Sequence, residues 1–402
     1  MSTRSHPPLW LLVLVTFSGT LAMHMFVPAL TTAARELGTT PATVQMTISL
    51  YVLGLAFGQL AYGPLSDKYG RRPTLLIGLA LYTAAGVVCM LATSVQVLVA
   101  ARFVQALGGC AGLLLARAIV HDTADTDDTL RRLAMLSLLT MVGPGLAPLL
   151  GSFVLASFGW RYIFVFFVAL GVIGLALSWQ LLPETRRADA TEGKRSVLSE
   201  DYMTLLRSPS FVGCVIGGGC ATTGFYAFLA AAPFIFVEQL HQPLEAVGIY
   251  LCLLIVGISI GNVIASRLVR RVGLNRLIVG ANAISVVCAF FLLAQVLLFG
   301  PNTICLVATM FVYCLGAGMC SPAVSTKAMS VTPRVTGSAA GLYGFAQMTI
   351  GAACTSLAGI GHDHGLSAAA VLVGAGVVGQ VAFWVAMKDV TRGDASWTTA
   401  ST

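Results

Sequence analysis

Two long apolar runs of this sequence are separated by the stretch Gly63-Pro64-Leu65-Ser66-Asp67-Lys68-Tyr69-Gly70-Arg71-Arg72. Its charged side chains and open backbone groups cannot lie in hydrocarbon, because they would find no hydrogen-bonding partners there. The stretch is therefore predicted to be a short, turn-rich loop at a membrane face. The rest of the chain can be placed relative to this loop.

The composition indicates a membrane protein. Of the 402 residues, 57% are hydrophobic and only 10% are charged, whereas a soluble domain averages about 25% charged residues. No soluble fold can hide that much apolar surface, so lipid must be the solvent for most of it. The ten Cys residues lie mostly inside apolar runs and show neither a Cys-x-x-Cys pair nor a metal-ligand spacing. We therefore predict no metal and no cofactor.

Twelve apolar runs are long enough to cross a bilayer, which requires about 20 residues. They lie near residues 9–30, 43–63, 73–93, 95–118, 133–156, 161–182, 210–236, 245–266, 275–298, 302–324, 337–360 and 367–387. The longest polar break divides them into six and six. The predicted organisation is an N-terminal bundle (1–182), a cytoplasmic central loop (183–208) and a C-terminal bundle (209–402).

The positions of Lys and Arg predict the orientation of the spans. Nearly all of them lie in loops on one side, with the central loop and both chain ends, and the opposite loops hold only Arg35 and Arg161. Loops rich in Lys and Arg stay in the cytoplasm, so both termini are predicted to be cytoplasmic. The same distribution accounts for the net charge of +7 without nucleic acid as a partner.

Three motifs carry a family resemblance. The opening stretch closely matches Gly-x-x-x-Asp-[Arg/Lys]-x-Gly-[Arg/Lys]-[Arg/Lys], the loop motif of the major facilitator superfamily. The stretch Arg102-Phe103-Val104-Gln105-Ala106-Leu107-Gly108 resembles that family's Arg-x-x-Gln-Gly-x-Gly motif, with Ala106 where Gly is usual. In the fifth span, residues 143–151 resemble the family's Gly/Pro-rich antiporter motif, marked here by Pro144, Pro148 and Gly151.

Further stretches resemble one branch of that family, the bicyclomycin/chloramphenicol-resistance (Bcr/CflA-like) drug exporters. They are residues 23–30, 115–118 and 183–185. The resemblance implies an all-α integral membrane fold with twelve transmembrane helices in two six-helix pseudo-repeat bundles. It also implies a monomeric transporter of the bacterial inner membrane that exports small molecules, antibiotics among them, by alternating access.

Other function classes fit less well. A metabolite carrier on the same scaffold, moving a nucleoside, an amino acid or a similar solute with or without proton coupling, is the alternative function. A membrane enzyme finds no support, because the sequence has no nucleotide-binding loop, interior acid pair or nucleophile–base arrangement. Family analogy is only a prior for the substrate itself.

The loop motif is predicted to act as a conformational latch. Asp122 ends the fourth span on the same membrane face as Asp67, with Arg117 about one helical turn inside it. We expect the opposite charges to hold helices together in one transport state; alternatively, they only set the topology. The predicted latch residues are Gly63, Asp67, Gly70, Arg71, Arg72, Arg117 and Asp122.

His24 is a departure from the resembled branch, whose first span usually carries Asp in an Asp-Met-Tyr-x-Pro context. All sixteen Asp and Glu residues fall in loops or at span ends, so the usual proton carrier of the branch is missing. A histidine titrates near neutrality and can carry the coupled proton instead. Alternatively, His24 only forms hydrogen bonds and transport is not proton-coupled.

Interior polar residues predict the character of the substrate. His24 and Arg102 lie about 9 and 10 Å inside the ends of their predicted spans, at 1.5 Å per residue. A lone Arg at that depth needs a partner or a water-filled cavity, so we expect a positively biased patch that favours neutral or anionic amphiphiles. The predicted substrate-binding residues are His24, Tyr51, Arg102, Gln105, Tyr226, Tyr343 and Gln347.

Overall fold

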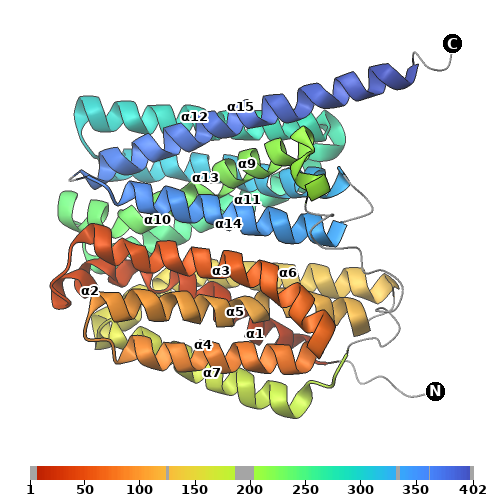
Figure 1. Cartoon of the computed structure of the whole chain (residues 1–402). Helices are drawn as coiled ribbons and strands as arrows, with labels where there is room; N and C mark the ends of the chain where they lie inside the picture. Colours follow the sequence, from red (N-terminus) through yellow and green to blue (C-terminus); the bar gives the residue numbers. More distant parts are fainter. Residues whose placement is uncertain (1–6, 124–125, 186–202, 332–335, 362, 399–402) are drawn as a thin grey trace. The chain divides into compact units, whose positions relative to one another are not determined.

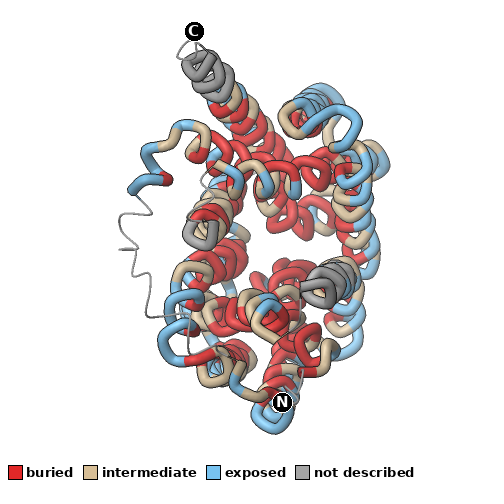
Figure 2. Tube along the Cα trace, turned by 90° about the vertical axis from the view of Figure 1, so that its right-hand side faces the viewer, coloured by how far each residue is buried: buried red, intermediate tan, exposed pale blue. Residues whose placement is uncertain are grey.

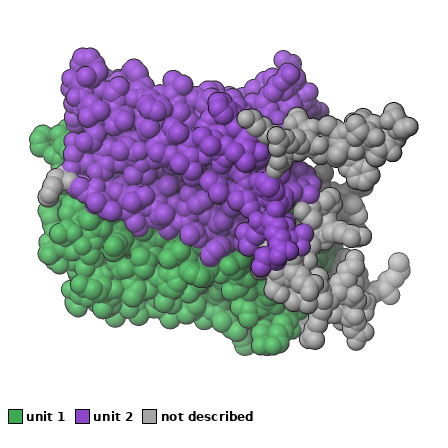
Figure 3. All heavy atoms as spheres, turned by 45° about the horizontal axis from the view of Figure 1, so that its top comes forward, with its two compact units in different colours: residues 1–194, 236–252 green, residues 195–235, 253–402 purple. Residues whose placement is uncertain are grey.

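The computed structural model describes the chain except for residues 1–6, 124–125, 186–202, 332–335, 362 and 399–402. The described residues form helices and no strands. Contacts between helices divide the chain into two compact units, coloured green and purple in Figure 3. Unit 1 holds residues 1–194 and 236–252, and unit 2 holds residues 195–235 and 253–402. Most of the predicted central loop, 183–208, lies outside the described residues.

Unit 1 consists of seven α-helices, one short 3-10 helix and the segment Phe236–Cys252 in its described part. The helices are α1 (Leu9–His24), η1 (Val27–Ala29), α2 (Leu30–Glu36), α3 (Pro41–Tyr69), α4 (Arg71–Met90), α5 (Val95–Thr123), α6 (Thr126–Phe158) and α7 (Arg161–Leu181). In Figure 1, α3, α5, α4 and α7 lie side by side in that order, each in contact with the next. Helix α1 packs against α5, α6 and α7.

Unit 2 contains the remaining helices. They are α9 (Pro209–Thr223), α10 (Phe225–Phe234), most of α11 (Leu244–Val272), α12 (Leu274–Phe299), α13 (Thr303–Ser330), α14 (Thr336–Ala358) and α15 (His364–Thr398). A π-helical turn, η3 (Ile235–Gln239), follows α10. Helix α9 contacts α13, α14 and α15, and α12 contacts both α13 and α15.

Most of these helices are suited to a bilayer. Eleven segments of the described chain are long and apolar enough to cross a membrane. The twelfth predicted span corresponds to α14, which has 23 residues but is interrupted by Gly, Ser, Thr and Gln residues. Large apolar side chains are exposed on the outside, with Phe299 at 86% and Ile304 at 81%. Such exposure is stable only where hydrocarbon is the solvent.

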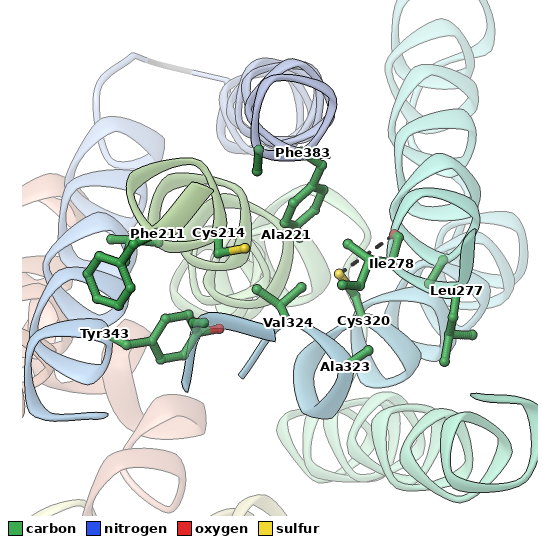
Figure 4. Packing of buried hydrophobic residues seen from close by; sticks show 14 of the residues in the cluster. Phe211, Cys214, Ala221, Leu277, Ile278, Cys320, Ala323, Val324, Tyr343 and Phe383 are labelled. Atoms are coloured by element: carbon green, nitrogen blue, oxygen red, sulfur yellow. Dashed lines mark hydrogen bonds between the residues drawn. The ribbon is translucent and has the colours of Figure 1, made fainter. Parts of the chain in front are cut away.

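Buried residues run along the helices of both units (Figure 2). In unit 2, Phe211, Cys214, Val324 and Tyr343 converge on one another from α9, α13 and α14 (Figure 4). Cys320 in the same cluster points toward the carbonyl oxygen of Ile278 on α12. These thiols are therefore small core residues, and all ten cysteines are free.

The two units repeat the same helix crossings. The stretch Arg102–Gly108 in α5 recurs in α13 as Met310-Phe311-Val312-Tyr313-Cys314-Leu315-Gly316. A Cβ on Gly54 would lie 2.6 Å from the Phe103 carbonyl oxygen, and a Cβ on Gly257 would lie 3.0 Å from the Phe311 carbonyl oxygen. Glycine at these positions lets the helix backbones approach closely, as is typical of membrane helices.

Gly108 and Gly316 occupy equivalent positions. A Cβ added at Gly108 would clash with the backbone of α4, and a Cβ added at Gly316 would clash with the backbone of α12. In this register Met310 of the second unit takes the place of Arg102. Among the described residues, this motif therefore carries a buried guanidinium in unit 1 and not in unit 2.

The first span of each half is broken at a similar point. Helix α1 ends at His24 after 16 residues, and α9 ends at Thr223 after 15 residues. The first break follows from Pro28, which has no amide hydrogen to donate to the His24 carbonyl four residues earlier. The second interruption, at Gly224, is slight: Gly224 keeps helical dihedral angles (φ −52°, ψ −33°), and its amide still donates to the Cys220 carbonyl oxygen four residues earlier at 3.3 Å. Broken spans expose backbone groups that can bind ions or substrates.

Candidate functional site

Arg102 is held at the break in the first span. Its side chain is fully buried, and one terminal nitrogen donates to the Ala22 carbonyl oxygen at 2.8 Å. The other terminal nitrogen donates to Gln105 Oε1, also at 2.8 Å. The carbonyls at the end of α1 lack helical donors and carry the negative end of the helix dipole. Arg102 therefore caps the broken end of α1.

Aromatic rings surround the same guanidinium. Its central carbon lies 4.0 Å from the ring centroid of Tyr51, 5.4 Å from that of Phe26 and 5.9 Å from that of Phe164. Cation–π attraction is strongest where water is excluded. The Arg102 guanidinium has no carboxylate partner among the described residues. A backbone carbonyl, a side-chain amide and three aromatic rings stabilise its charge instead.

The predicted cationic patch was expected to contact substrate, but its side chains are packed inside unit 1. Tyr51 and Gln105 are fully buried like Arg102, and the Tyr51 hydroxyl donates to the Gly19 carbonyl oxygen at 2.9 Å. Packing within unit 1 occupies all three side chains. Their role in substrate binding stays a prediction, and the geometry assigns them to holding the break.

His24 is the last residue of α1. Its Nδ1 lies 3.0 Å from the Thr20 carbonyl oxygen, and the residue is largely buried. The span continues through α2 to Glu36 rather than ending at Leu30. His24 therefore lies roughly 18 Å inside that end at 1.5 Å per residue, twice the depth predicted. Pro28 was the sequence signal for this break.

The predicted residues of unit 2 gather around the second break. Gln347 Nε2 on α14 donates to Thr222 Oγ1 at 2.6 Å, and Thr223 Oγ1 donates to the Gln347 carbonyl oxygen at 3.2 Å. A Cβ on Gly351 would lie 3.0 Å from Tyr226 Cδ2. The threonines were missed from the sequence because α9 reads as one apolar run. Their hydroxyls make this break neutral and rich in hydrogen-bonding groups.

Tyr343 contacts α9 about one turn before these threonines. A Cβ on Gly218 of α9 would lie 2.5 Å from its hydroxyl oxygen. Tyr343 is nearly fully buried in the unit 2 core. The structure therefore brings Tyr226 of α10, and Tyr343 and Gln347 of α14, to the interface of α14 with α9 and α10.

The antiporter motif packs on the first break. A Cβ on Gly151 of α6 would lie only 2.0 Å from the Met25 carbonyl oxygen, directly after His24. The same helix contacts the start of α11, since a Cβ on Gly248 would lie 2.8 Å from the Pro148 carbonyl oxygen. Pro144 stands one turn before Pro148 and is partly buried. These small residues allow backbone-to-backbone contact, as the motif predicts.

The opening stretch is mostly helical, which corrects the predicted loop. Helix α3 continues through Gly63 and Pro64 to Tyr69, and α4 begins at Arg71. Only Gly70 interrupts them, with φ of 101°. Charged residues tolerate this helical extension because a helix satisfies its backbone groups internally, and only the side chains need water.

An acidic side chain from another part of the chain stabilises this junction. Glu184 Oε1 accepts from the Arg71 backbone N–H at 2.9 Å, and its Oε2 accepts from the Arg72 backbone N–H at 3.2 Å. A carboxylate is favoured at a helix N-terminus, where N–H groups lack helical partners. Glu184 thus caps α4, a role that the sequence did not reveal.

Three of the five charged residues of the predicted latch, Asp67, Arg71 and Asp122, meet. Arg71 pairs with Asp67 at 2.6 Å and with Asp122 at 2.9 Å, and it also donates to the Ser66 hydroxyl. Arg117 is exposed and forms no ion pair with a described residue. Arg72 instead donates to the Trp179 carbonyl oxygen at 2.7 Å. The cluster therefore joins α3, α4 and α5 through Arg71, without Arg117.

The two motif glycines have unequal roles, which gives a testable prediction. We expect Gly70→Ala to destabilise the protein by about 1–3 kcal/mol, because its backbone conformation suits only glycine. Gly63 is helical, and no atom lies within 4 Å of a Cβ added there. Gly63→Ala is therefore expected to be neutral or stabilising by up to about 1 kcal/mol. Thermal unfolding of the detergent-solubilised variants measures both. Equal effects of the two substitutions would contradict this assignment.

Comparison with known proteins places the chain in a family. The Major Facilitator Superfamily model matches residues 12–356. The bicyclomycin resistance protein homolog of Haemophilus influenzae is 27% identical over 343 residues, covering 83% of this chain and 84% of the relative. Multidrug resistance protein D of Escherichia coli is 31% identical over 349 residues, covering 84% of each chain.

Solved structures share the fold. A bacterial homolog of the human lysosomal transporter Spinster, in an inward-facing and occupied conformation, has a TM-score of 0.76 at 15% identity, covering 94% of this chain and 95% of its own. A D-xylose-proton symporter has a TM-score of 0.73 at 17% identity, covering 94% of this chain and 97% of its own. Together with the repeated helix crossings and the matched sequence motifs, these findings show that the chain is a multi-pass membrane transporter of the major facilitator superfamily, of the Bcr/CflA-like type.

Proposed function

We propose that this protein is a secondary-active exporter of small amphiphilic antibiotics in the bacterial inner membrane, with both termini cytoplasmic. It works by alternating access and exchanges its substrate for protons. The observation that carries the proposal is the pair of broken spans, which place His24 and the Thr222–Gln347 group at the ends of α1 and α9. The names of the relatives support a drug as the substrate.

The charges at each of the two breaks, taken separately, favour neutral or anionic substrates. The described partners of Arg102 at the first break are neutral, and those of Gln347 at the second break are hydroxyls and backbone. A lipophilic cation would find no carboxylate among these residues. Aromatic rings with a few polar groups suit a small amphiphile.

Proton coupling is assigned to His24. The residue is buried at the end of α1, and its hydrogen bond to Thr20 engages Nδ1, which leaves the Nε2 atom for proton exchange. A histidine changes charge near neutral pH, so its protonation alters the charge at the break by one unit. We propose that this change couples the proton gradient to transport.

The test is drug transport in inside-out membrane vesicles, with and without an imposed pH gradient. Wild-type vesicles are expected to accumulate chloramphenicol when the lumen is acidic and to accumulate cationic ethidium poorly. His24→Asn is expected to keep exchange of substrate between the two sides but to lose the stimulation by the gradient. His121→Asn, which changes an exposed histidine of α5, is the matched control.

Each alternative has its own outcome in this assay. Full stimulation by the gradient in His24→Asn would overturn the proton role. Preferred uptake of ethidium over chloramphenicol would overturn the charge preference. Transport of a nucleoside or an amino acid with no drug transport would replace the export function with a metabolite carrier.

A further inference from the structure

Helix α2 is the outer piece of the first broken span. It has only seven residues, and the break at Met25–Phe26 separates it from α1. A helix this short is not stable by itself, because too few hydrogen bonds offset the cost of starting it. Its position must therefore be set by contacts with the rest of unit 1.

The last residue of α2 makes the strongest of these contacts. Glu36 Oε2 accepts from Trp160 Nε1 at 2.8 Å and from Arg161 at 2.7 Å. Arg161 also lies over the Trp160 ring at 4.3 Å and donates to the Ala92 carbonyl oxygen at 3.4 Å. We call Glu36, Trp160 and Arg161 the α2 clasp. It joins the end of α2 to the start of α7 and to the turn between α4 and α5.

Trp160 connects the clasp to the break. Its indole is almost fully buried, and its ring centroid lies 6.3 Å from that of Phe26, the residue after the break. Phe26 in turn lies 5.0 Å from Phe164 and 5.4 Å from the Arg102 guanidinium. One carboxylate at the end of α2 is thus linked through two rings to the residue that caps α1.

Energetic considerations single out the Trp160 bond. Glu36 and Arg161 are both more than 40% exposed, and an exposed ion pair contributes little. The indole N–H belongs to a buried ring, which would lose its acceptor if Glu36 were removed. The clasp therefore depends on Glu36 as an acceptor for Trp160 more than on the charge of Arg161.

We propose that Glu36 is a positioning residue of the transporter: through Trp160 it fixes α2 and Phe26, and so keeps His24 and Arg102 in place at the break. This inference rests on the proposed function of the break. Glu36 lies roughly 18 Å along the span from His24 by helical rise, so it cannot touch a substrate bound there. Its loss should slow turnover and leave substrate affinity nearly unchanged.

Hydrogen exchange tests the proposal without any substrate. In Glu36→Ala and in Trp160→Phe, amides of residues 26–36 are expected to exchange about tenfold faster, because a charged hydrogen bond to a buried group is lost. Amides of α1 before Thr20 should exchange as in the wild type. Glu36→Gln keeps an acceptor oxygen and should be milder. Arg35→Gln, which changes an exposed charge beside Glu36, is the control.

Transport kinetics give the second readout. We expect the maximal rate to fall about tenfold in Glu36→Ala and Trp160→Phe, with KM changed less than about twofold. The double variant should be no worse than either single one, because both remove the same bond. Unchanged exchange of residues 26–36 in both variants would overturn the inference, as would faster exchange throughout unit 1. The exchange result stands even if the substrate is not a drug.

Discussion

Replacing Arg102 by methionine is expected to abolish transport and to lower the thermal unfolding midpoint. The Ala22 carbonyl and the Gln105 amide would lose their donor, and three rings would lose their cation. Methionine is already present at the equivalent Met310, so the helix crossing itself accepts its shape. We expect transport to fall at least about a hundredfold, since leaving buried polar groups unpaired costs about 1–3 kcal/mol each.

The matched control lies on the same helix. Arg117→Met removes the same group from an exposed position without a described ion pair, so stability should change by less than about 0.5 kcal/mol. Transport in vesicles and thermal unfolding in detergent measure both variants. Equal losses would mean that positive charge on α5, and not the cap on α1, is what matters. Arg102→Lys should retain little activity, because an ammonium cannot reproduce the planar fork of donors.

A methyl group added at Gly151 is expected to displace α6 from the break. The Cβ of alanine would lie 2.0 Å from the Met25 carbonyl oxygen. A backbone atom cannot move aside by changing rotamer, so the helices would have to shift apart. We expect Gly151→Ala to destabilise the protein by about 1–3 kcal/mol, as overpacking does elsewhere. Transport should fall about tenfold or more if the break must keep its shape.

The control is a helical glycine with open space around it. Gly280 of α12 has no atom within 4 Å of an added Cβ, so Gly280→Ala should be neutral or stabilise by up to about 1 kcal/mol through helix propensity. Thermal unfolding and vesicle transport again provide the measurements. A Gly151→Ala protein as stable and active as the Gly280→Ala protein would show that α6 does not hold the break.

The sequence predicted the fold closely because span length and hydropathy are local properties. Eleven of the twelve predicted spans are confirmed by length and composition. The exception, α14, is the one whose Tyr343 and Gln347 face α9, where polar and small residues lower its hydropathy. Helix boundaries were less accurate. The extension of α3 to Tyr69 was missed because charge was taken as evidence against helix, although a helix can emerge into water.

The site was predicted less well, for a physical reason. The sequence indicates that Arg102 needs a partner but not which one, and the partner proved to be a carbonyl 80 residues away. The Glu184 cap on α4 spans 113 residues. For Arg117 the sequence was misleading. Its position near Asp122 in the sequence suggested an ion pair, but Asp122 pairs with Arg71 instead.

By itself the sequence determined that lipid surrounds most of this chain and that no carboxylate lies deep within the predicted spans. These conclusions follow from hydropathy and from the positions of the acidic residues, which are local properties of the chain. Only the tertiary structure decided that the buried guanidinium caps α1, that Gly151 packs against the break, and that Trp160 and Arg161 donate to Glu36 at the end of α2. Those outcomes depend on which faces of distant helices meet, and close packing sets that for the whole unit at once.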